Sequence, residues 1–553
     1  MRIRRATVAT TAVATLLVAG CVGLPDSGPV TAGEVQEGTG LGDVEFIAEG
    51  PVAGASQDEI VQGFLQAALS PADDFSIARE YLADGAIWDP LASVTLRSGQ
   101  PQLTSSGGAT VDAVVDVVGE VDEHGSFTSV ADDATRLSFV LIEQRGEWRI
   151  AEAPPGLVLS RFSFERLFDA QTLAWFADDR SILVPDVRWF PRTSADLAGD
   201  VVDAVLAGPV AWLAPAVWSA ADADAVRVGD VVLTDETAEI TVSFEQVQES
   251  SSVELSLLAL QLQQALARLG VTEVVLGVDG VDGYSASSLD APEAAFPTVD
   301  ARPLVLADGA LAFVGQGAPF EADWGVDLDA IDATSLTVRD ADGLGVALAS
   351  GQVLRLTSGA SPSVLDTGVT VAPSLDRAGW AWWVPDPAIQ AIVASDGTRE
   401  IVLALPELEG RISSIAVSRD GARIAVATDA GGGTATWVAG IVREEGVPTS
   451  IASPQRMPQA TGTAVDLAWA TATSLAVLTS TTDGGQQLVQ LALGGTTQQL
   501  ATPQDAITQL AGGVGASSSL RARSADGELL VLRGGQWQAA SSVTDVRLVA
   551  IQI

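Results

Sequence analysis

The feature that most constrains the fold of this chain is a strand–turn–strand pattern that recurs through its second half. In the clearest copy, residues 415–426, two apolar strands flank the turn Asp420-Gly421. Intervals of about 35–55 residues between copies are typical of propeller blades, and a closed ring protects strand edges. The pattern predicts a β-propeller over 295–553, with a pair of β-sandwiches as the alternative because the spacing is uneven. The other copies lie at 304–314, 336–348, 374–384, 467–478 and 525–532.

The segment 45–170 combines helix and strand patterns. Ser56-x-x-Glu59 is typical of a capping box, in which a hydroxyl and a carboxylate satisfy free amides of a first helical turn. Apolar residues then follow at helical spacing up to Pro71, and a second helix is expected at about 76–82. Alternating strands come next, at 110–117, 136–142 and 146–150. We expect a cone-like α+β domain that serves docking or packing.

The segment 171–290 has the element order β, α, β, β, α, β. Its expected strands are 181–185, 226–233, 238–244 and 274–278, and its helices begin near Ser194 and at the capping box Ser251-x-x-Glu254. Gly208 and Gly270 supply the helix stops. Two helices on one face of a small sheet would bury these apolar faces. The predicted fold class is therefore multidomain, with two small α+β domains followed by an all-β C-terminal propeller.

The N-terminal sequence is typical of a lipoprotein leader. Arginines among the first five residues precede a short apolar run at 6–18. Val18-Ala19-Gly20-Cys21 then resembles the bacterial lipobox. We therefore expect a signal peptide at 1–20, and S-diacylglycerol attachment with N-acylation (palmitate) at Cys21, because stable anchoring needs more than one acyl chain. With a flexible tether at 21–44, the protein would be lipid-anchored on the outer face of the cell membrane.

Composition removes several functional classes. The formal charge of −42, from 71 acidic and 29 basic residues, disfavours nucleic-acid binding. No lysine is present, so P-loop and Schiff-base chemistry lack their amine. The single histidine, His124, lies in a polar segment where a solvent-facing turn is expected. With one cysteine and one histidine, we expect no metal, no cofactor, no catalytic set and no disulfide.

Two residue clusters, one of tryptophans and one of aspartates, are candidates for a functional site. Alternation along a strand puts Trp380 and Trp382 on one face and Trp383 on the other, so at least one is expected in the core, and a sugar-stacking platform is the alternative. Asp327, Asp329 and Asp332 could serve calcium binding or acid–base chemistry, but a solvated loop is the simpler interpretation in so acidic a chain.

The whole order of segments resembles the actinobacterial lipoprotein LpqB family. Residues 181–280 look like its GerMN module, also found in spore-germination lipoproteins, on the helix end Leu206-Ala207-Gly208-Pro209. Residues 146–167 resemble the close of its N-terminal domain. The resemblance implies an accessory modulator of a two-component system of the MtrA–MtrB type, in envelope homeostasis and division, that contacts the sensor kinase's extracytoplasmic domain. The family resemblance assigns no catalytic residues to this chain. Binding of cell-wall glycan or peptide is the alternative function.

Overall fold

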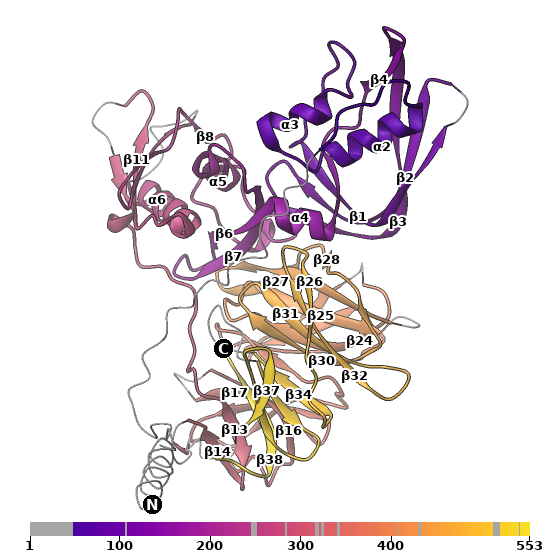
Figure 1. Ribbon diagram of the computed structural model, residues 1–553. Helices are drawn as coiled ribbons and strands as arrows, with labels where there is room; N and C mark the ends of the chain where they lie inside the picture. The colour runs from indigo at the N-terminus through magenta and orange to yellow at the C-terminus, as the bar shows by residue number, and fades with distance from the viewer. Residues whose placement is uncertain are drawn as a thin grey trace, which may run out of the picture. The chain divides into compact units, whose positions relative to one another are not determined.

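The computed structural model describes residues 48–553 apart from several short segments (Figure 1). The leader, Cys21 and the tether lie outside the described residues. So do the short segments 106–107, 245–251, 282–284, 316–319, 322–325, 340–342, 406–407, 430–432, 513–519 and 541.

The N-terminal domain packs helices against one five-stranded sheet of order β4-β3-β2-β1-β5, with β1 and β5 parallel. The predicted capping box is confirmed, since Glu59 N donates to Ser56 Oγ (3.4 Å) and Ser56 N donates to Glu59 Oε2 (2.8 Å). The second helix lies earlier than the predicted 76–82, because apolar spacing alone does not mark its first turn. The elements are α2 (Gln57–Ala67), α3 (Ala72–Arg79), β1 (Ser93–Ser105), β2 (Thr110–Asp122), β3 (Phe127–Gln144), β4 (Glu147–Glu152), β5 (Leu157–Ser160) and α4 (Arg161–Leu167).

The second domain contains a long hairpin and a separate small sheet. The hairpin is β6 paired with β7, and the sheet has the order β12-β11-β10-β8, with β9 also paired to β10. The helices α5 and α6 pack with this sheet into one core. The elements are β6 (Phe168–Phe176), β7 (Leu183–Pro191), α5 (Leu197–Leu206), η1 (Ala214–Ala216), β8 (Val226–Arg227), β9 (Val232–Thr234), β10 (Thr237–Ser243), α6 (Ser252–Leu266), η2 (Ala267–Leu269), β11 (Glu273–Val278), β12 (Ser285–Ser287) and η3 (Ser288–Asp290).

Two expectations for this domain need correction. The strand expected at 181–185 belongs to β7 and pairs with β6, outside the small sheet. Its partner β6 crosses the boundary expected at 170/171 between the first and second domains. The strand expected at 226–233 is interrupted at Gly229, whose φ of +75° breaks it into β8 and β9. The two glycine stops are confirmed, with φ of +91° at Gly208 and +85° at Gly270, whereas Ser251 lies outside the described residues.

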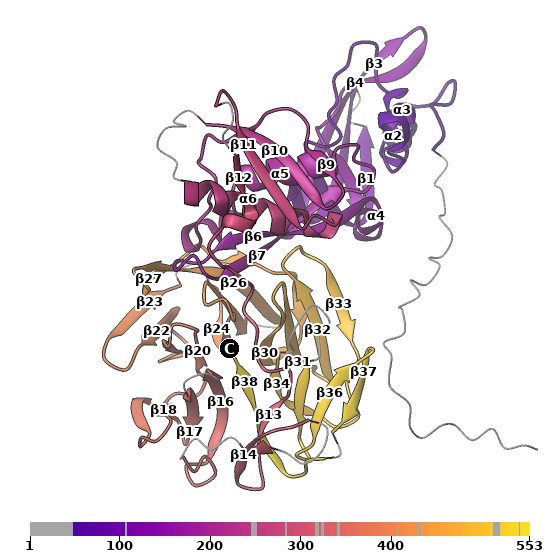
Figure 2. The same ribbon diagram turned by 90° about the vertical axis from the view of Figure 1, so that its left-hand side faces the viewer.

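The C-terminal domain is a β-propeller whose described strands form six blades (Figure 2). We number them in chain order: blade one is β38-β13-β14-β15, blade two β16–β19, blade three β20–β23, blade four β24–β27 with β28 and β29 added on β26, blade five β30–β33 and blade six β34–β37. The last strand, β38, closes the ring, because it pairs antiparallel with β13 and parallel with β16.

The strands of the propeller are β13 (Leu304–Ala307), β14 (Ala310–Phe313), β15 (Phe320–Glu321), β16 (Ala333–Arg339), β17 (Leu344–Ala349), β18 (Gln352–Thr357), β19 (Ser363–Thr367), β20 (Ser374–Leu375), β21 (Ala381–Trp383), β22 (Ala391–Ser395), β23 (Glu400–Ala404), β24 (Arg411–Val417), β25 (Arg423–Asp429), β26 (Gly433–Glu444), β27 (Val447–Ile451), β28 (Gln455–Arg456), β29 (Ala460–Thr461), β30 (Thr463–Thr471), β31 (Ser474–Ser480), β32 (Gln486–Ala492), β33 (Thr497–Leu500), β34 (Ile507–Ala511), β35 (Arg521–Ser524), β36 (Leu529–Arg533), β37 (Gln536–Ala539) and β38 (Val546–Gln552).

The propeller prediction is confirmed and the sandwich alternative is wrong. Four of the six strand–turn–strand copies fall on the hairpin between the first and second strands of blades two to five. The copies at 304–314 and 525–532 fall one strand later, on the turns between β13 and β14 in blade one and between β35 and β36 in blade six. The extra strands β28 and β29 also lengthen blade four. These two features account for the uneven spacing.

Candidate functional site

The hairpin β6–β7 contacts the propeller directly (Figure 1). Trp189 Nε1 on β7 donates to the carbonyl oxygen of Gly494 in blade five (2.8 Å), and Gly446 N in blade four donates to Asp178 Oδ2 (2.8 Å). The Arg161 guanidinium donates to the carbonyl oxygen of Gly495. The propeller and the preceding domains are thus joined by one buried, one part-buried and one exposed hydrogen bond as well as by the chain itself.

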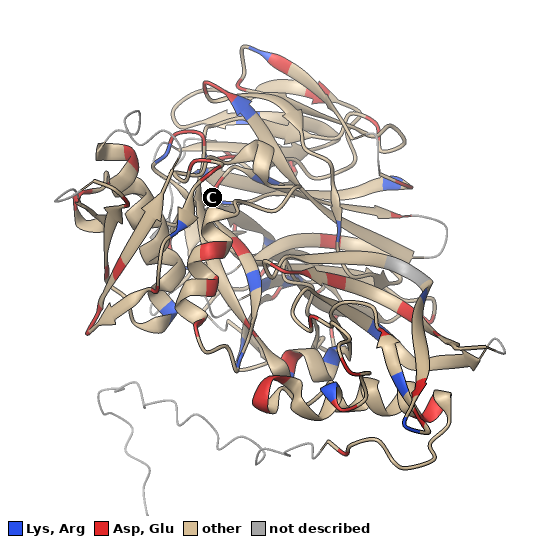
Figure 3. Ribbon diagram, turned by 90° about the horizontal axis from the view of Figure 1, so that it is seen from above, with Lys and Arg blue, Asp and Glu red and all other residues tan. Residues whose placement is uncertain are grey.

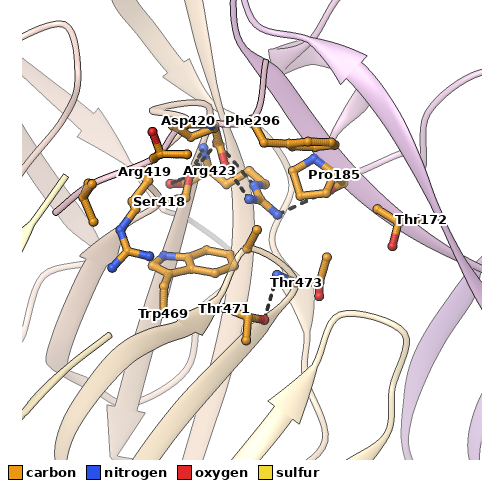
Figure 4. Close-up of a pocket in the computed structure, with 14 residues that line it drawn as sticks. Thr172, Pro185, Phe296, Ser418, Arg419, Asp420, Arg423, Trp469, Thr471 and Thr473 are labelled. Atoms are coloured by element: carbon orange, nitrogen blue, oxygen red, sulfur yellow. Dashed lines mark hydrogen bonds and ion pairs between the residues drawn. The ribbon is translucent and has the colours of Figure 1, made fainter. Parts of the chain in front are cut away.

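A cavity of about 380 Å³ lies at this junction (Figure 4). We call it the junction cavity. One wall is the hairpin β6–β7, another is the connection 296–299 that leads into the propeller, and the remainder comes from the first hairpin turns of blades four and five. The size is within the range of small-molecule pockets. The lining residues are Thr172, Pro185, Phe296, Pro297, Thr298, Val299, Ser418, Arg419, Asp420, Arg423, Trp469, Thr471, Ala472 and Thr473.

A buried ion pair, Arg423 with Asp420, forms the centre of one wall (Figure 4). Both side chains are buried, and Arg423 Nη1 also donates to the carbonyl oxygen of Pro185 (3.4 Å). Asp420 additionally accepts from Ser418 Oγ (2.6 Å). The Arg423 guanidinium lies over the Trp469 ring, 4.7 Å from its centroid. Each group of this wall is therefore held in one orientation by several partners.

A second arginine, Arg419, is among the residues that line the same cavity. Arg419 Nε donates to the carbonyl oxygen of Gln552 (3.1 Å) and Arg419 Nη2 to that of Gly512 (3.3 Å). Burial lowers the pKa of Arg419. Burial, together with the nearby charge of Arg419, also lowers the pKa of Arg521 to about 10, against the opposing effect of Asp300. The cavity thus adjoins a region where positive charge is concentrated and poorly solvated.

The edge of the small sheet in the second domain is apolar and exposed. The strands β8 and β9 lie end to end along β10. Exposed fractions are 56% for Val226, 51% for Val232 and 49% for Leu233, and Val228 is also exposed. We call this surface, formed by residues 226–233, the apolar edge. Exposed sheet edges present free backbone groups, and proteins usually shield them with charge or cover.

The three tryptophans of the predicted cluster are all buried. Trp380 and Trp382 belong to one hydrophobic cluster and Trp383 to another, as alternation along a strand predicts. Trp382 Nε1 donates to Asp376 Oδ2 (2.9 Å) and Trp383 Nε1 to Asp366 Oδ2 (2.7 Å). The core interpretation is confirmed, and the sugar-stacking platform is wrong because these rings are covered.

The other predicted candidates lie apart from the junction cavity. The Asp327 carboxylate accepts from Ala330 N (2.9 Å), while Asp329 and Asp332 form ion pairs with Arg547. His124 occupies an exposed turn, as predicted, and its backbone N donates to Asp122 Oδ1 (2.9 Å). Among the described residues, no group of three or more His, Cys, Asp or Glu could hold a metal ion. Acidic residues are instead spread over the described chain (Figure 3).

Sequence reasoning identified the turn at 420–421 and the strand around Trp469 only as blade markers. The available signal was Ser418-Arg419-Asp420-Gly421-Ala422-Arg423, which places two of the few basic residues in one turn. Its meaning depends on Trp469 from the next blade and Pro185 from another domain, and no local pattern relates these positions.

Comparison with known proteins agrees with this architecture. Residues 50–165 match the family model "Lipoprotein LpqB, N-terminal domain", and residues 324–548 match "Lipoprotein LpqB beta-propeller domain". The chain belongs to the LpqB lipoprotein family. Among LpqB relatives, Lipoprotein LpqB of Cutibacterium acnes is 26% identical, with 88% of each chain covered. That of Streptomyces avermitilis is 26% identical over 95% of this chain and 94% of the relative.

Solved structures resemble part of this LpqB chain at low identity. A streptogramin B lyase structure is 11% identical, with a TM-score of 0.30 over 43% of this chain and 83% of that chain. The structure "YCF48 bound to D1 peptide" is 14% identical, with a TM-score of 0.28 over 38% of this chain and 66% of that chain. Within the described part of the LpqB chain, no helix is both long and apolar enough to cross a membrane.

Proposed function

We propose that this LpqB-family chain is a lipid-anchored docking protein on the outer face of the cell membrane that modulates a sensor kinase of the MtrB type. The observation that carries the proposal is the apolar edge at 226–233. A partner strand can add to such an edge through main-chain hydrogen bonds, while side-chain pockets supply specificity.

The anchor follows from the sequence. Cys21 ends a lipobox-like motif, and residues 21–44 provide the tether. Because acylation at Cys21 would hold the chain at the membrane surface, the docking surfaces would stay within reach of the extracytoplasmic part of a membrane kinase. A catalytic role receives no support from the described side chains around the junction cavity, where the only carboxylate that lines it, Asp420, is engaged by Arg423, Ser418 and Ala422 N.

The charge around the apolar edge restricts the partner. Asp224, Asp230, Asp235 and Glu236 flank its strands and are exposed. A partner surface with an apolar strand and basic neighbours would complement it, because like-charge contacts are disfavoured across interfaces. The alternative of glycan binding on a tryptophan platform loses its basis, since Trp380, Trp382 and Trp383 are buried.

The test is a binding titration between the acylated protein in detergent micelles and the extracytoplasmic domain of the kinase from the same organism. Leu233→Asp should weaken binding at least about tenfold, which corresponds to about 1.4 kcal/mol. Val402→Asp is the matched control, because Val402 is 67% exposed on the outer strand of blade three. Failure of the unmodified protein to bind, or equal weakening by both variants, would contradict the proposal.

A further inference from the structure

A groove of about 580 Å³ lies in the N-terminal domain between helix α2 and strand β1, which Figure 1 labels. We call it the helix groove. One wall is a single face of α2 and its end, because the lining residues there recur at intervals of three and four. The opposite side comes from β1 and β5. The lining residues are Asp58, Gln62, Leu65, Gln66, Leu69, Arg97, Gln100, Pro101, Leu103 and Val158.

An irregularity in strand pairing places Arg97 on the side of the sheet that α2 covers. The register of β1 against β2 shifts immediately before Arg97, skips Val118 and brings Arg97 opposite Val117. Residues directly opposed on neighbouring strands share a face of the sheet. By alternation along β2, Val117 shares its face with Ala113, which packs in the core with Phe64 of α2. The bulge therefore turns a charged residue toward the helix groove.

The Arg97 guanidinium is only partly satisfied. Of its five N–H donors, those on Nη1 reach the carbonyl oxygen of Gly99, whereas Nε is buried and meets no acceptor among the described residues. Burial lowers the pKa of Arg97, and no carboxylate of the described chain offsets this effect. Asp58, the one carboxylate among the lining residues, accepts instead from Ser105 Oγ. An anion at Arg97 would supply the missing acceptors and the missing negative charge.

The other lining side chains are carboxamides and aliphatic groups. The carboxamides belong to Gln62, Gln66 and Gln100. Each can both donate and accept, which is what an amide group of a ligand requires. The aliphatic groups are those of Leu65, Leu69, Pro101, Leu103 and Val158. A suitable ligand therefore has one negative group, an amide and an apolar side group.

We propose that the helix groove binds a small carboxylate ligand of the N-acyl amino-acid class, with its carboxylate at Arg97 and its apolar side chain against Leu65 and Leu103. Arginine suits this role because its planar guanidinium matches carboxylate geometry. A phosphate group carries close to two negative charges at neutral pH and would meet one cation and Asp58, so a carboxylate fits better. The groove shares no lining residue with the junction cavity or the apolar edge, so this site is independent of any kinase partner.

The experiment is a calorimetric titration of the acylated full-length protein in detergent micelles with N-acetyl-leucine and with N-acetyl-leucinamide, which lacks the negative charge. The acid should bind, and the amide should bind at least about tenfold more weakly. Arg97→Gln should abolish this preference. Arg136→Gln is the matched control and should leave it unchanged, because Arg136 lies on β3 of the same sheet, is 69% exposed and does not line the groove.

A second variant keeps the test decisive if Arg97→Gln does not fold. Gln66 lines the groove but is exposed on α2, so Gln66→Trp should fill the groove without disturbing the core and should abolish binding of the acid. Inorganic phosphate should not displace the acid. The proposal is overturned if neither compound binds to the unmodified protein, if acid and amide bind equally, if phosphate competes with the acid, or if Gln66→Trp binds the acid as well as the unmodified protein does.

Discussion

The junction cavity and the apolar edge both reverse the usual distribution of charged residues at the surface and apolar residues in the core. At the cavity, guanidinium and carboxylate groups are buried, whereas at the edge valine and leucine side chains are exposed. Burying charge is costly unless each group is paired, and exposing apolar sheet edges invites association. The difference indicates two modes of recognition. The cavity has the volume of a small-ligand pocket and is lined by paired groups, while the edge is exposed and suits a protein strand.

The buried ion pair of Arg423 and Asp420 is better explained by its role in positioning the walls of the junction cavity than by a gain in folding free energy. Replacing a buried pair with apolar residues is often neutral or stabilising. Arg423 and Asp420 instead connect the turn of blade four to Pro185 of the hairpin and to Trp469 of blade five. The pair therefore fixes three walls of the cavity relative to one another.

The largest expected effect comes from breaking this pair. Asp420→Ala leaves the Arg423 guanidinium buried without its carboxylate, so the free energy of unfolding of the propeller should fall by about 3–5 kcal/mol in chemical denaturation. Asp84→Ala is the control, because it removes an ion pair with Arg145 whose side chains are 65% and 81% exposed. The control should change stability by less than about 1 kcal/mol. Equal effects of the two substitutions would remove the distinction between buried and exposed charge.

The next effect depends on pH. Asp466, half-buried on the strand that carries Trp469, has its pKa raised to about 6 by burial, although Leu510 N and Leu467 N donate to it. Because the folded pKa exceeds that of the unfolded chain, the stabilising contribution is present below about pH 4 and is lost as pH rises through 6.

Asp466→Asn should therefore gain stability relative to the unmodified protein by about 2–3 kcal/mol between pH 4 and pH 7.5, measured by denaturation at a series of pH values. The exposed Asp526 in blade six provides the control substitution, Asp526→Asn. Parallel pH profiles for Asp466→Asn and the unmodified protein would show that this carboxyl group does not titrate as described.

A smaller effect is expected from alanine substitutions at two glycines of blade five. The comparison separates the loss of a packing contact at the junction from backbone strain. Gly495 and Gly484, both in turns of blade five, have φ of +86° and +85°. An alanine costs about 1–2 kcal/mol at either position. A Cβ at Gly495 would also lie 2.3 Å from the Phe127 ring, while nothing lies within 4 Å of one at Gly484.

Hydrogen exchange should therefore increase in β7 and around residue 127 for Gly495→Ala and not for Gly484→Ala. Identical exchange in these two variants would mean that the packing of Phe127 on the propeller does not hold the junction together.

The smallest effect is expected at the apolar edge. Leu233→Asp places a charge on a half-exposed position, so the free energy of unfolding should change by less than about 0.5 kcal/mol. Thermal or chemical denaturation measures it. A much larger loss would indicate that the edge packs against the protein itself, and the contrast between the two sites would then fail.

The sequence was sufficient to predict those features that depend only on neighbouring residues. The capping box at Ser56, the stop at Gly208 and the alternation of Trp382 and Trp383 depend on neighbouring residues, and all three are confirmed. The pairing of β7 with β6 was missed because an apolar strand does not specify its partner. The junction cavity was missed because its walls come from segments far apart in the chain, such as Thr172 and Trp469.

The function we propose for this chain is docking through the apolar edge while it is held at the membrane. Site-specific photocrosslinking at Leu233 in intact cells tests it most directly, with Val402 as the second probe position. A kinase adduct is expected from Leu233 and none from Val402, and the adduct should be lost when Cys21 is replaced by Ala. The absence of a kinase adduct at Leu233, or the same adducts at both positions, would contradict it.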